Sequence, residues 1–302
     1  MRERPWQAVI DIGSNSVLLL LARPRDEGPA LEVADDRCII TRLGEGVARS
    51  GVLKPEAIER TLAALRTFRE LADERGAAIR AVTTEGVRLA GNQADFLGPA
   101  AAIVGGPVRV LSGDEEARFS YLSVAAETDG GGRPLRVVDI GGASTELVVG
   151  RGPTVIHAVS HPIGSVKLTE RFVDHDPPTP ASLEAMAAHV AEVLATQPLP
   201  PQPRLHGLAG TITTAAALLL DLPRYDRDQV DGTEHPRGAI EALRDRLAAI
   251  PTAERVGPLL PVGRADVFVS GLTILLGVMD HCGAETLVVR DRGHRYALID
   301  RS

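Results

Sequence analysis

The sequence predicts an α/β protein of two related halves, each with a mixed β-sheet flanked by helices. Segments with strand and helix periodicity alternate along the whole chain, as they do in α/β folds. A ten-residue pattern occurs at 11–20 (DIGSNSVLLL) and again at 139–148 (DIGGASTELV). Two copies in 302 residues, a length sufficient for two ordinary domains, indicate an internal duplication.

Each copy consists of an acid, a polar turn with glycine and an apolar run, and each follows another apolar run. Residues 8–10 (AVI) precede Asp11, and residues 136–138 (RVV) precede Asp139. We therefore expect a strand, a tight turn and a second strand in each half, with the acid ending the first strand. Glycines let a ligand approach the backbone, and successive N–H groups with hydroxyls bind anions. Two such turns indicate a ligand with several phosphates, held between two related domains.

The remaining elements follow from periodicity and from helix caps. Apolar residues recur at helical spacing in 55–75, and residues 112–114 (SGD) are typical of a cap for a helix from 115 to about 127. We expect an N-terminal domain over 1–118 with the first phosphate loop. The C-terminal domain is expected over 119–302 with the second loop, and its last helix can pack back on the first domain. Strands are further expected at 78–82, 108–111, 135–139, 154–159, 205–208 and 286–289, helices at 87–92, 167–172, 182–195, 210–220, 236–249 and 267–281, a turn at 129–133 and a last short helix opened by 291–294.

Composition excludes several classes of function. Aromatic residues make up only 3% of the chain, so stacking platforms for single-stranded nucleic acid are not expected. The formal net charge of −7 argues against broad nucleic-acid binding and favours a local phosphate site built from dipoles, a few basic side chains and metal ions. We expect no signal peptide, and the sequence has no apolar run of membrane-spanning length. Cys38 and Cys282 have neither metal-ligand nor redox spacing. We therefore expect a cytoplasmic protein that binds neither nucleic acid nor membrane.

The acids and hydroxyls of the two turns are the first candidates for a functional site. Asp11 and Asp139 repel phosphate, but they suit a Mg²⁺ ion, or another divalent cation, that neutralises phosphate oxygens. A third candidate is the strand–helix junction at Gly210 and Thr211, where N–H groups and the helix dipole favour an anion. Taken singly, each turn is also typical of an ordinary hairpin loop or strand–helix connection. The phosphate-binding candidates from the three turns are Gly13, Ser14, Asn15, Gly141, Gly142, Ser144, Thr145, Gly210 and Thr211.

Together these motifs resemble the exopolyphosphatase / guanosine pentaphosphate phosphohydrolase (Ppx/GppA) family of the actin-like ATPase superfamily. The matches fall in the order of the family and cover nearly the whole chain, so that the set is highly specific. The matching segments are 11–16 (DIGSNS), 88–92 (RLAGN), 112–118 (SGDEEAR), 139–146 (DIGGASTE), 164–170 (GSVKLTE), 207–211 (GLAGT), 264–266 (RAD) and 291–293 (DRG).

The resemblance implies two actin-like (ribonuclease H-like) domains with the active-site cleft between them, and cleavage of a terminal phosphoanhydride by water without a phosphoenzyme. It implies that Glu116 is the general base and that Arg88 reaches the phosphate chain. Glu146 would be a catalytic residue whose carboxylate helps Asp11 and Asp139 to organise the metal and the attacking water. From the residues alone, Glu116 and Arg88 are typical of solvated helix positions, and Glu146 of an outward position on a strand.

Three positions depart from the family pattern. Ala143 replaces the last glycine of the usual turn, so we expect a negative φ there and an unchanged N–H donor. Lys167 stands where many members have arginine, and Ser165 where some have cysteine. The chain resembles the short form of the family, and His157 and His161 are expected at the surface.

We therefore expect an exopolyphosphatase that releases terminal orthophosphate from inorganic polyphosphate by metal-assisted attack of water. Removal of the 5′-phosphate of guanosine pentaphosphate is the nearest alternative, because it needs the same chemistry. An ATP-dependent kinase or ATPase, or a non-catalytic sensor of polyphosphate or nucleotides, is a more remote alternative. A homodimer is plausible from the resemblance alone.

Overall fold

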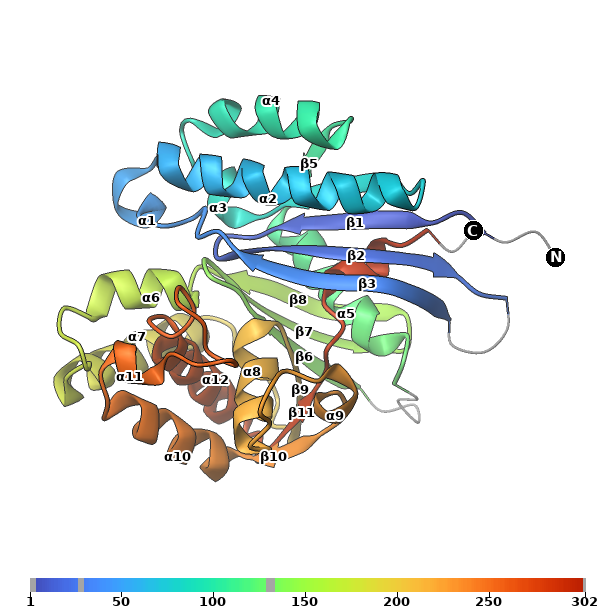
Figure 1. Cartoon of the computed structure of the whole chain (residues 1–302). Coiled ribbons are helices and arrows are strands. Elements are labelled where there is room, and N and C mark those ends of the chain that lie inside the picture. The colour runs from blue at the N-terminus through green and yellow to red at the C-terminus, as the bar shows by residue number, and fades with distance from the viewer. Residues whose placement is uncertain (1–3, 27–29, 129–133, 301–302) are drawn as a thin grey trace. The chain divides into compact units, whose positions relative to one another are not determined.

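The structure of the protein is a computed structural model that describes residues 4–26, 30–128 and 134–300 (Figure 1). The turn predicted at 129–133 lies outside these residues. Within the described ranges, no helix is both long enough and apolar enough to cross a membrane.

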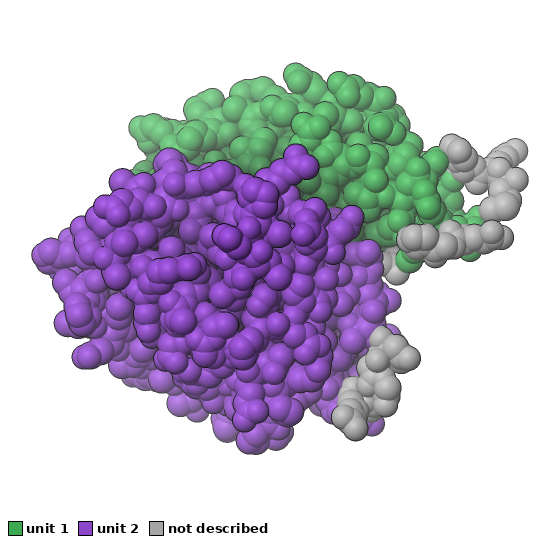
Figure 2. Space-filling model, turned by 60° about the horizontal axis from the view of Figure 1, so that its bottom comes forward, with its two compact units in different colours: residues 1–119, 294–302 green, residues 120–293 purple. Residues whose placement is uncertain are grey.

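The chain divides into two compact units, which Figure 2 draws in different colours. Unit 1 comprises Met1–Phe119 together with His294–Ser302, and unit 2 comprises Ser120–Gly293. The boundary after Phe119 falls inside helix α5 (Gly113–Ala125). Unit 1 therefore contains the end of the chain as well as its beginning.

Unit 1 is built on a five-stranded mixed sheet with the strand order β3-β2-β1-β4-β5. β1 pairs antiparallel with β2, as the prediction of a hairpin requires, and parallel with β4. The strands are β1 (Gln7–Ile12), β2 (Ser16–Pro24), β3 (Leu31–Ile40), β4 (Ala78–Thr83) and β5 (Val108–Val110). The helices are α1 (Val47–Ser50), α2 (Pro55–Glu74), α3 (Glu85–Arg88), α4 (Gln93–Val104), the start of α5 and the 3₁₀ helix η1 (His294–Leu298).

Unit 2 is built on a six-stranded mixed sheet with the strand order β10-β11-β9-β6-β7-β8. Here β6 pairs antiparallel with β7 and parallel with β9, so the second hairpin occupies the same kind of place in its sheet as the first. The strands are β6 (Leu135–Ile140), β7 (Thr145–Arg151), β8 (Thr154–His161), β9 (Arg204–Leu208), β10 (Glu234–Pro236) and β11 (Thr286–Val289). The helices that follow α5 are α6 (Ser165–Phe172), α7 (Pro180–Ala195), α8 (Gly210–Leu219), α9 (Arg227–Val230), α10 (Arg237–Ala248), α11 (Thr252–Arg255) and α12 (Phe268–Cys282).

The predicted fold class, α/β with two mixed sheets flanked by helices, is confirmed. One expected element is wrong: the segment 87–92 does not form a single short helix, because α3 ends at Arg88 and α4 begins at Gln93. α4 escapes sequence reasoning because Gly98 and Pro99, which disfavour helix interiors, lie within it. Its buried Phe96, Ala100 and Val104, on one face, outweigh that local preference.

Alternation along β1 separates two faces of the first sheet. Ile10 and Ile12 pack in the core that α2 and α4 cover. Val9 belongs to a second core on the other face, with Tyr296 and Leu298 from the end of the chain. Asp11 follows Val9 by two residues, so its side chain points to the face that the C-terminal segment covers.

The second sheet places its acids in the same way. Val138 and Ile140 of β6, and Leu147 of β7, belong to the large core of unit 2. Asp139 and Glu146 therefore point to the opposite face. They are direct partners in the β6–β7 register, which sets the two carboxylates side by side.

Candidate active site

The two polar turns close in the same way. Gly13 donates its N–H to the Ser16 carbonyl at 3.0 Å, and Gly141 donates to the Ser144 carbonyl at 2.9 Å. A Cβ on either glycine would lie 3.2 Å from that same oxygen, so glycine is needed for close approach. Positive φ at non-glycine residues is confined to Arg42, Ala209 and Asp221 within the described part of the chain, which confirms the prediction for Ala143.

Neighbouring backbone amides occupy the carbonyl groups of the first turn. The Ser14 carbonyl accepts from the Gly44 N–H at 2.8 Å, and the Asn15 carbonyl accepts from the two N–H groups of 41–42 at 3.1 and 3.0 Å. The Ser14 side chain is packed so closely that a Cβ on Gly44 or Gly86 would approach it to 2.7 or 2.4 Å. Because its carbonyls are occupied, the turn offers a ligand mainly N–H donors and side-chain polar groups, which suits an anion.

The second turn is held by the start of α6. The Gly141 carbonyl accepts from the Ser165 N–H at 3.0 Å, and the Gly142 carbonyl accepts from the N–H groups of 166–167 at 2.9 and 3.2 Å. A Cβ on Gly164 would lie 2.4 Å from the Gly142 carbonyl carbon, so α6 begins in direct contact with the turn. The second turn therefore also presents N–H donors rather than carbonyl groups.

A reciprocal N-terminal cap at the start of α5 fixes the helix turn that carries Glu116. Ser112 Oγ accepts from the Glu115 N–H at 3.2 Å, and the Glu115 carboxylate accepts from the Ser112 N–H at 3.0 Å, which is a capping box. Asp114 is exposed and Glu115 is partly exposed, whereas Glu116 is buried. The acidic helix start alone favours a solvated position for Glu116. That prediction is wrong.

Arg88 is the partner of the buried Glu116 carboxylate. Its Nη1 donates to Glu116 Oε1 at 2.9 Å and also to the Leu111 carbonyl. Burial raises the pKa of Glu116 to about 7, against the opposing effects of Arg88 and His294, and the charge of Asp11 acts in the same direction as burial. A carboxyl with a pKa near neutrality is suited to accept a proton from water.

His294 joins this cluster from the other end of the chain. Its Nε2 lies 3.1 Å from Asp11 Oδ1, and both residues are buried. Sequence reasoning missed His294, although it directly follows the 291–293 motif. Unit 1 thus brings together three predicted site residues, Asp11, Arg88 and Glu116, with an unpredicted histidine.

In unit 2, serine hydroxyls hold the two neighbouring acids. Ser120 Oγ donates to Asp139 Oδ2 at 2.6 Å, and Ser160 Oγ donates to Glu146 Oε1 at 2.7 Å. Glu146 is buried, so the outward position typical of a strand acid is wrong. Neither serine was predicted, because neither lies in a turn motif.

The other predicted phosphate ligands of unit 2 have contacts of their own. Thr145 is fully buried, and its hydroxyl donates to the Ile163 carbonyl at 2.7 Å. Gly210 opens α8, and a Cβ on it would lie 3.2 Å from Arg264 Nη2. Thr211 is buried in the first turn of α8, and the Arg264 guanidinium adds positive charge to this helix N-terminus.

The donor sets fit a cation that substrate helps to bind, rather than a closed protein site. Across the described ranges, no group of three or more His, Cys, Asp or Glu side chains could hold a metal ion. Mg²⁺ is usually bound by one or two carboxylates together with phosphate oxygens and water. The facing pair of Asp139 and Glu146 meets that requirement.

The expected surface position of His161 is wrong. Its exposed fraction is 3%, and burial lowers its pKa. It is the last residue of β8 and pairs with Thr145, next to the second turn. His157, on the same strand, is half-buried.

A family model and a curated relative match nearly the whole chain. The model of the Ppx/GppA phosphatase family matches residues 25–302. Exopolyphosphatase 2 of Mycobacterium tuberculosis, strains CDC 1551 / Oshkosh and ATCC 25618 / H37Rv, is 36% identical over 287 residues, or 89% of this chain and 88% of the relative.

Solved structures agree with this match. The Aquifex aeolicus PPX-GPPA enzyme has a TM-score of 0.81 at 36% identity, over 97% of this chain and 98% of that chain. An exopolyphosphatase-like protein has a TM-score of 0.88 at 29% identity, over 97% of both chains. The family resemblance is thereby confirmed, and the chain has the fold of solved members of that family.

Proposed function

Because this chain belongs to the Ppx/GppA phosphatase family, we propose that it releases terminal orthophosphate from inorganic polyphosphate. The observation that carries the proposal is the buried Glu116, with a pKa of about 7 and a hydrogen bond from Arg88. The 36% identity to an exopolyphosphatase supports the choice of substrate.

Glu116 is the proposed general base. Its carboxylate accepts a proton from the attacking water as the new oxygen–phosphorus bond forms, and the anhydride oxygen leaves with the shortened chain. Arg88 holds the Glu116 carboxylate in place and supplies a fixed positive charge for the phosphate chain. The N–H groups of 14–15 in the first turn and of 142–143 in the second bind phosphate oxygens, while those of Gly13 and Gly141 close the turns.

We propose Mg²⁺, or another divalent cation, as the cofactor. Asp139 and Glu146 would hold it in unit 2, and Asp11 is the candidate ligand of unit 1. When bound, the cation supplies charge neutralisation at the phosphate oxygens. Ser120 and Ser160 orient the two unit 2 acids through the hydrogen bonds described above.

The experiment that tests the proposal compares substrates side by side. Phosphate release by the purified protein in Mg²⁺ would be measured on long polyphosphate, short polyphosphate, guanosine pentaphosphate and ATP, with Glu116→Gln as the inactive control. We expect polyphosphate to be the best substrate. A rate on guanosine pentaphosphate far above that on polyphosphate would identify the nucleotide as the substrate instead. Binding of polyphosphate without turnover would identify a sensor.

The remaining expectations about setting and partners stay predictions. We propose a cytoplasmic location, a homodimer and no binding of nucleic acid or membrane.

A further inference from the structure

We propose that His294 is a positioning residue of the active site, which fixes the carboxylate of Asp11 through a hydrogen bond from its imidazole. The contact between His294 and Asp11 is independent of the proposed function, whereas its expected effect on activity rests on that function. All of the residues that carry it lie in unit 1.

The carboxylate of Asp11 needs a donor at this place. Asp11 is only 6% exposed, and its Oδ1 is buried with no hydrogen bond of standard geometry. His294 Nε2 lies 3.1 Å from that oxygen, which is an ion-pair and hydrogen-bond distance. A buried carboxylate oxygen without a donor is costly, so a small rotation of the ring that completes this bond is strongly favoured.

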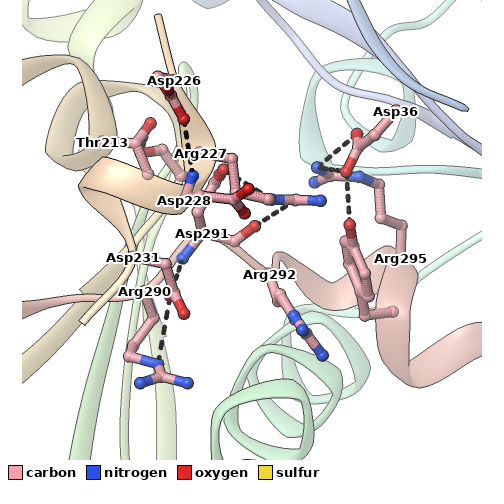
Figure 3. A network of polar contacts seen from close by, with 12 residues as sticks. Asp36, Thr213, Asp226, Arg227, Asp228, Asp231, Arg290, Asp291, Arg292 and Arg295 are labelled. Atoms are coloured by element: carbon pink, nitrogen blue, oxygen red, sulfur yellow. Dashed lines mark hydrogen bonds and ion pairs between the residues drawn. The ribbon is translucent and has the colours of Figure 1, made fainter. Parts of the chain in front are cut away.

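A clamp on strand β3 holds the segment that carries His294. Arg295 Nη2 donates to Asp36 Oδ1 at 2.8 Å, and the Tyr296 hydroxyl donates to Asp36 Oδ2 at 2.6 Å. Figure 3 shows Arg295 and Asp36 pointing toward one another, with dashed lines to both donors. Because one carboxylate binds the two residues that follow His294, the clamp fixes the start of η1.

Further contacts tie the rest of this segment to the first sheet. The side chain of Gln7 donates to the Asp300 carbonyl and accepts from the Asp300 N–H, both at 2.8 Å. Arg80 donates to the Leu298 carbonyl, and the Tyr296 ring is buried beside Val9. The imidazole is therefore held over the same face of β1 as Asp11. Partners that orient an active-site carboxylate typically contribute about 10- to 100-fold to activity or metal affinity.

The contact can be tested without any activity. In protein labelled with ¹⁵N-histidine, the ring nitrogen signals of His294 are expected to shift in Asp11→Asn, while those of the exposed His175 stay in place. Tyr296→Phe, which retains the ring and loses the hydroxyl, is expected to shift the His294 signals in part. Unchanged His294 signals in Asp11→Asn would overturn the proposal.

The consequence is tested on phosphate release, Mg²⁺ dependence and thermal midpoint. In His294→Ala, kcat is expected to fall about 10- to 100-fold, and the Mg²⁺ concentration for half-maximal rate to rise. His294→Gln retains an N–H donor and is expected to recover most of the parent kcat and most of the parent Mg²⁺ dependence. His175→Ala serves as the matched control. Parent-like kcat and Mg²⁺ dependence in His294→Ala would overturn the positioning role.

The two tests separate this inference from the proposed function. If the parent protein releases no phosphate from any substrate, the proposed function fails, and the ring signals still decide whether His294 contacts Asp11. If the parent is active and His294→Ala and His294→Gln lose activity equally with equal losses of thermal midpoint, the role of His294 is structural and the proposal fails.

Discussion

In the first hairpin Asp11 stands opposite Leu18, whereas in the second Asp139 stands opposite Glu146. The backbones of the two turns are closed by equivalent hydrogen bonds, and each first strand lies between an antiparallel and a parallel neighbour. The duplicated part is therefore the backbone frame, and the difference lies in the side chains that surround it.

The surroundings suggest a division of tasks between the two units. In unit 1, the acids Asp11 and Glu116 have basic partners, His294 and Arg88. In unit 2, the neighbouring acids are held by the hydroxyls of Ser120 and Ser160. Arg88 lowers the pKa of Glu116 against the effect of burial, whereas a pair of acids oriented by hydroxyls is suited to bind a cation.

The largest effect is expected at Glu116. Glu116→Gln has nearly the same shape and can still accept from Arg88, but it cannot take a proton from water, so kcat on polyphosphate should fall about 1,000-fold. Asp114→Asn, an exposed change in the same helix turn, is the matched control and should retain activity. Phosphate release by Glu116→Gln at the parent rate would show that Glu116 is not the general base.

The next effect should come from making the second hairpin like the first. Glu146→Leu places an apolar residue opposite Asp139, as Leu18 stands opposite Asp11, and should lower kcat about 100-fold. Glu146→Gln, which can still accept from Ser160, should be nearly as damaging because the charge is lost. Rates measured over a range of Mg²⁺ concentrations check this, and parent-like Mg²⁺ dependence in both variants would contradict a cation role for the pair.

The pH dependence reports on the basic partners of unit 1. Glu116 must be ionised to act, and its pKa of about 7 places the acid limb of kcat/KM there, so the value at pH 5 should be about 100-fold below the plateau. Removing the guanidinium in Arg88→Gln should move the limb to higher pH, because Arg88 lowers the pKa. An acid limb of kcat/KM at the parent pH in Arg88→Gln would contradict the effect of Arg88 on the pKa of Glu116.

The same pKa predicts a change in stability. Burial opposes ionisation of Glu116, so the folded parent loses stability as the pH rises from about 4.5, the usual pKa, to about 7. Glu116→Gln cannot ionise, so its free energy of unfolding should exceed that of the parent at pH 8, by up to about 3 kcal/mol. At pH 4 this difference should vanish. Chemical denaturation at the two pH values measures it.

Glycine substitutions compare how tightly the two turns are held. In Gly164→Ala the new Cβ meets the backbone of the second turn at 2.4 Å, and we expect a loss of about 3 kcal/mol in the free energy of unfolding. In Gly86→Ala the new Cβ meets the Ser14 side chain, with Oγ at 2.4 Å and Cβ at 3.3 Å. Because the hydroxyl can rotate and the Cβ contact needs only a small shift, the loss should be smaller, about 1 kcal/mol. Gly98→Ala, with open space in α4, is the control and should be neutral or stabilising. Equal losses at Gly86 and Gly164 would contradict the difference in packing.

The smallest effects are expected from the two hydroxyls of unit 2. Ser120→Ala and Ser160→Ala each remove one hydrogen bond to an acid and should lower activity about tenfold. Ser123 lies on the same helix as Ser120, and its hydroxyl donates to the backbone carbonyls of Ser120 and Arg292 rather than to an acid, so Ser123→Ala should retain activity. If all three variants retained parent activity, the hydroxyls would not orient the acids.

Sequence reasoning was sufficient wherever the signal is local. Apolar runs around an acid and a glycine predict both hairpins, and the 112–115 segment predicts the cap of α5, because a strand, a turn and a cap each depend on adjacent residues. α4 shows the limit of that rule. Gly98 and Pro99 oppose a helix locally, and only packing of its apolar face makes it stable.

The chain by itself determined the two hairpin frames and the face of each sheet on which the acids lie, because side chains alternate along a strand. What covers that face was decided only by the tertiary structure. The end of the chain brings His294 to Asp11, burial turns Glu116 from a solvated acid into one with a pKa of about 7, and Ser160 reaches Glu146 from the next strand. His294 comes from a distant segment, the burial of Glu116 depends on how the sheet and the helices pack, and the contact of Ser160 depends on the register of β7 with β8. A local sequence pattern specifies none of these.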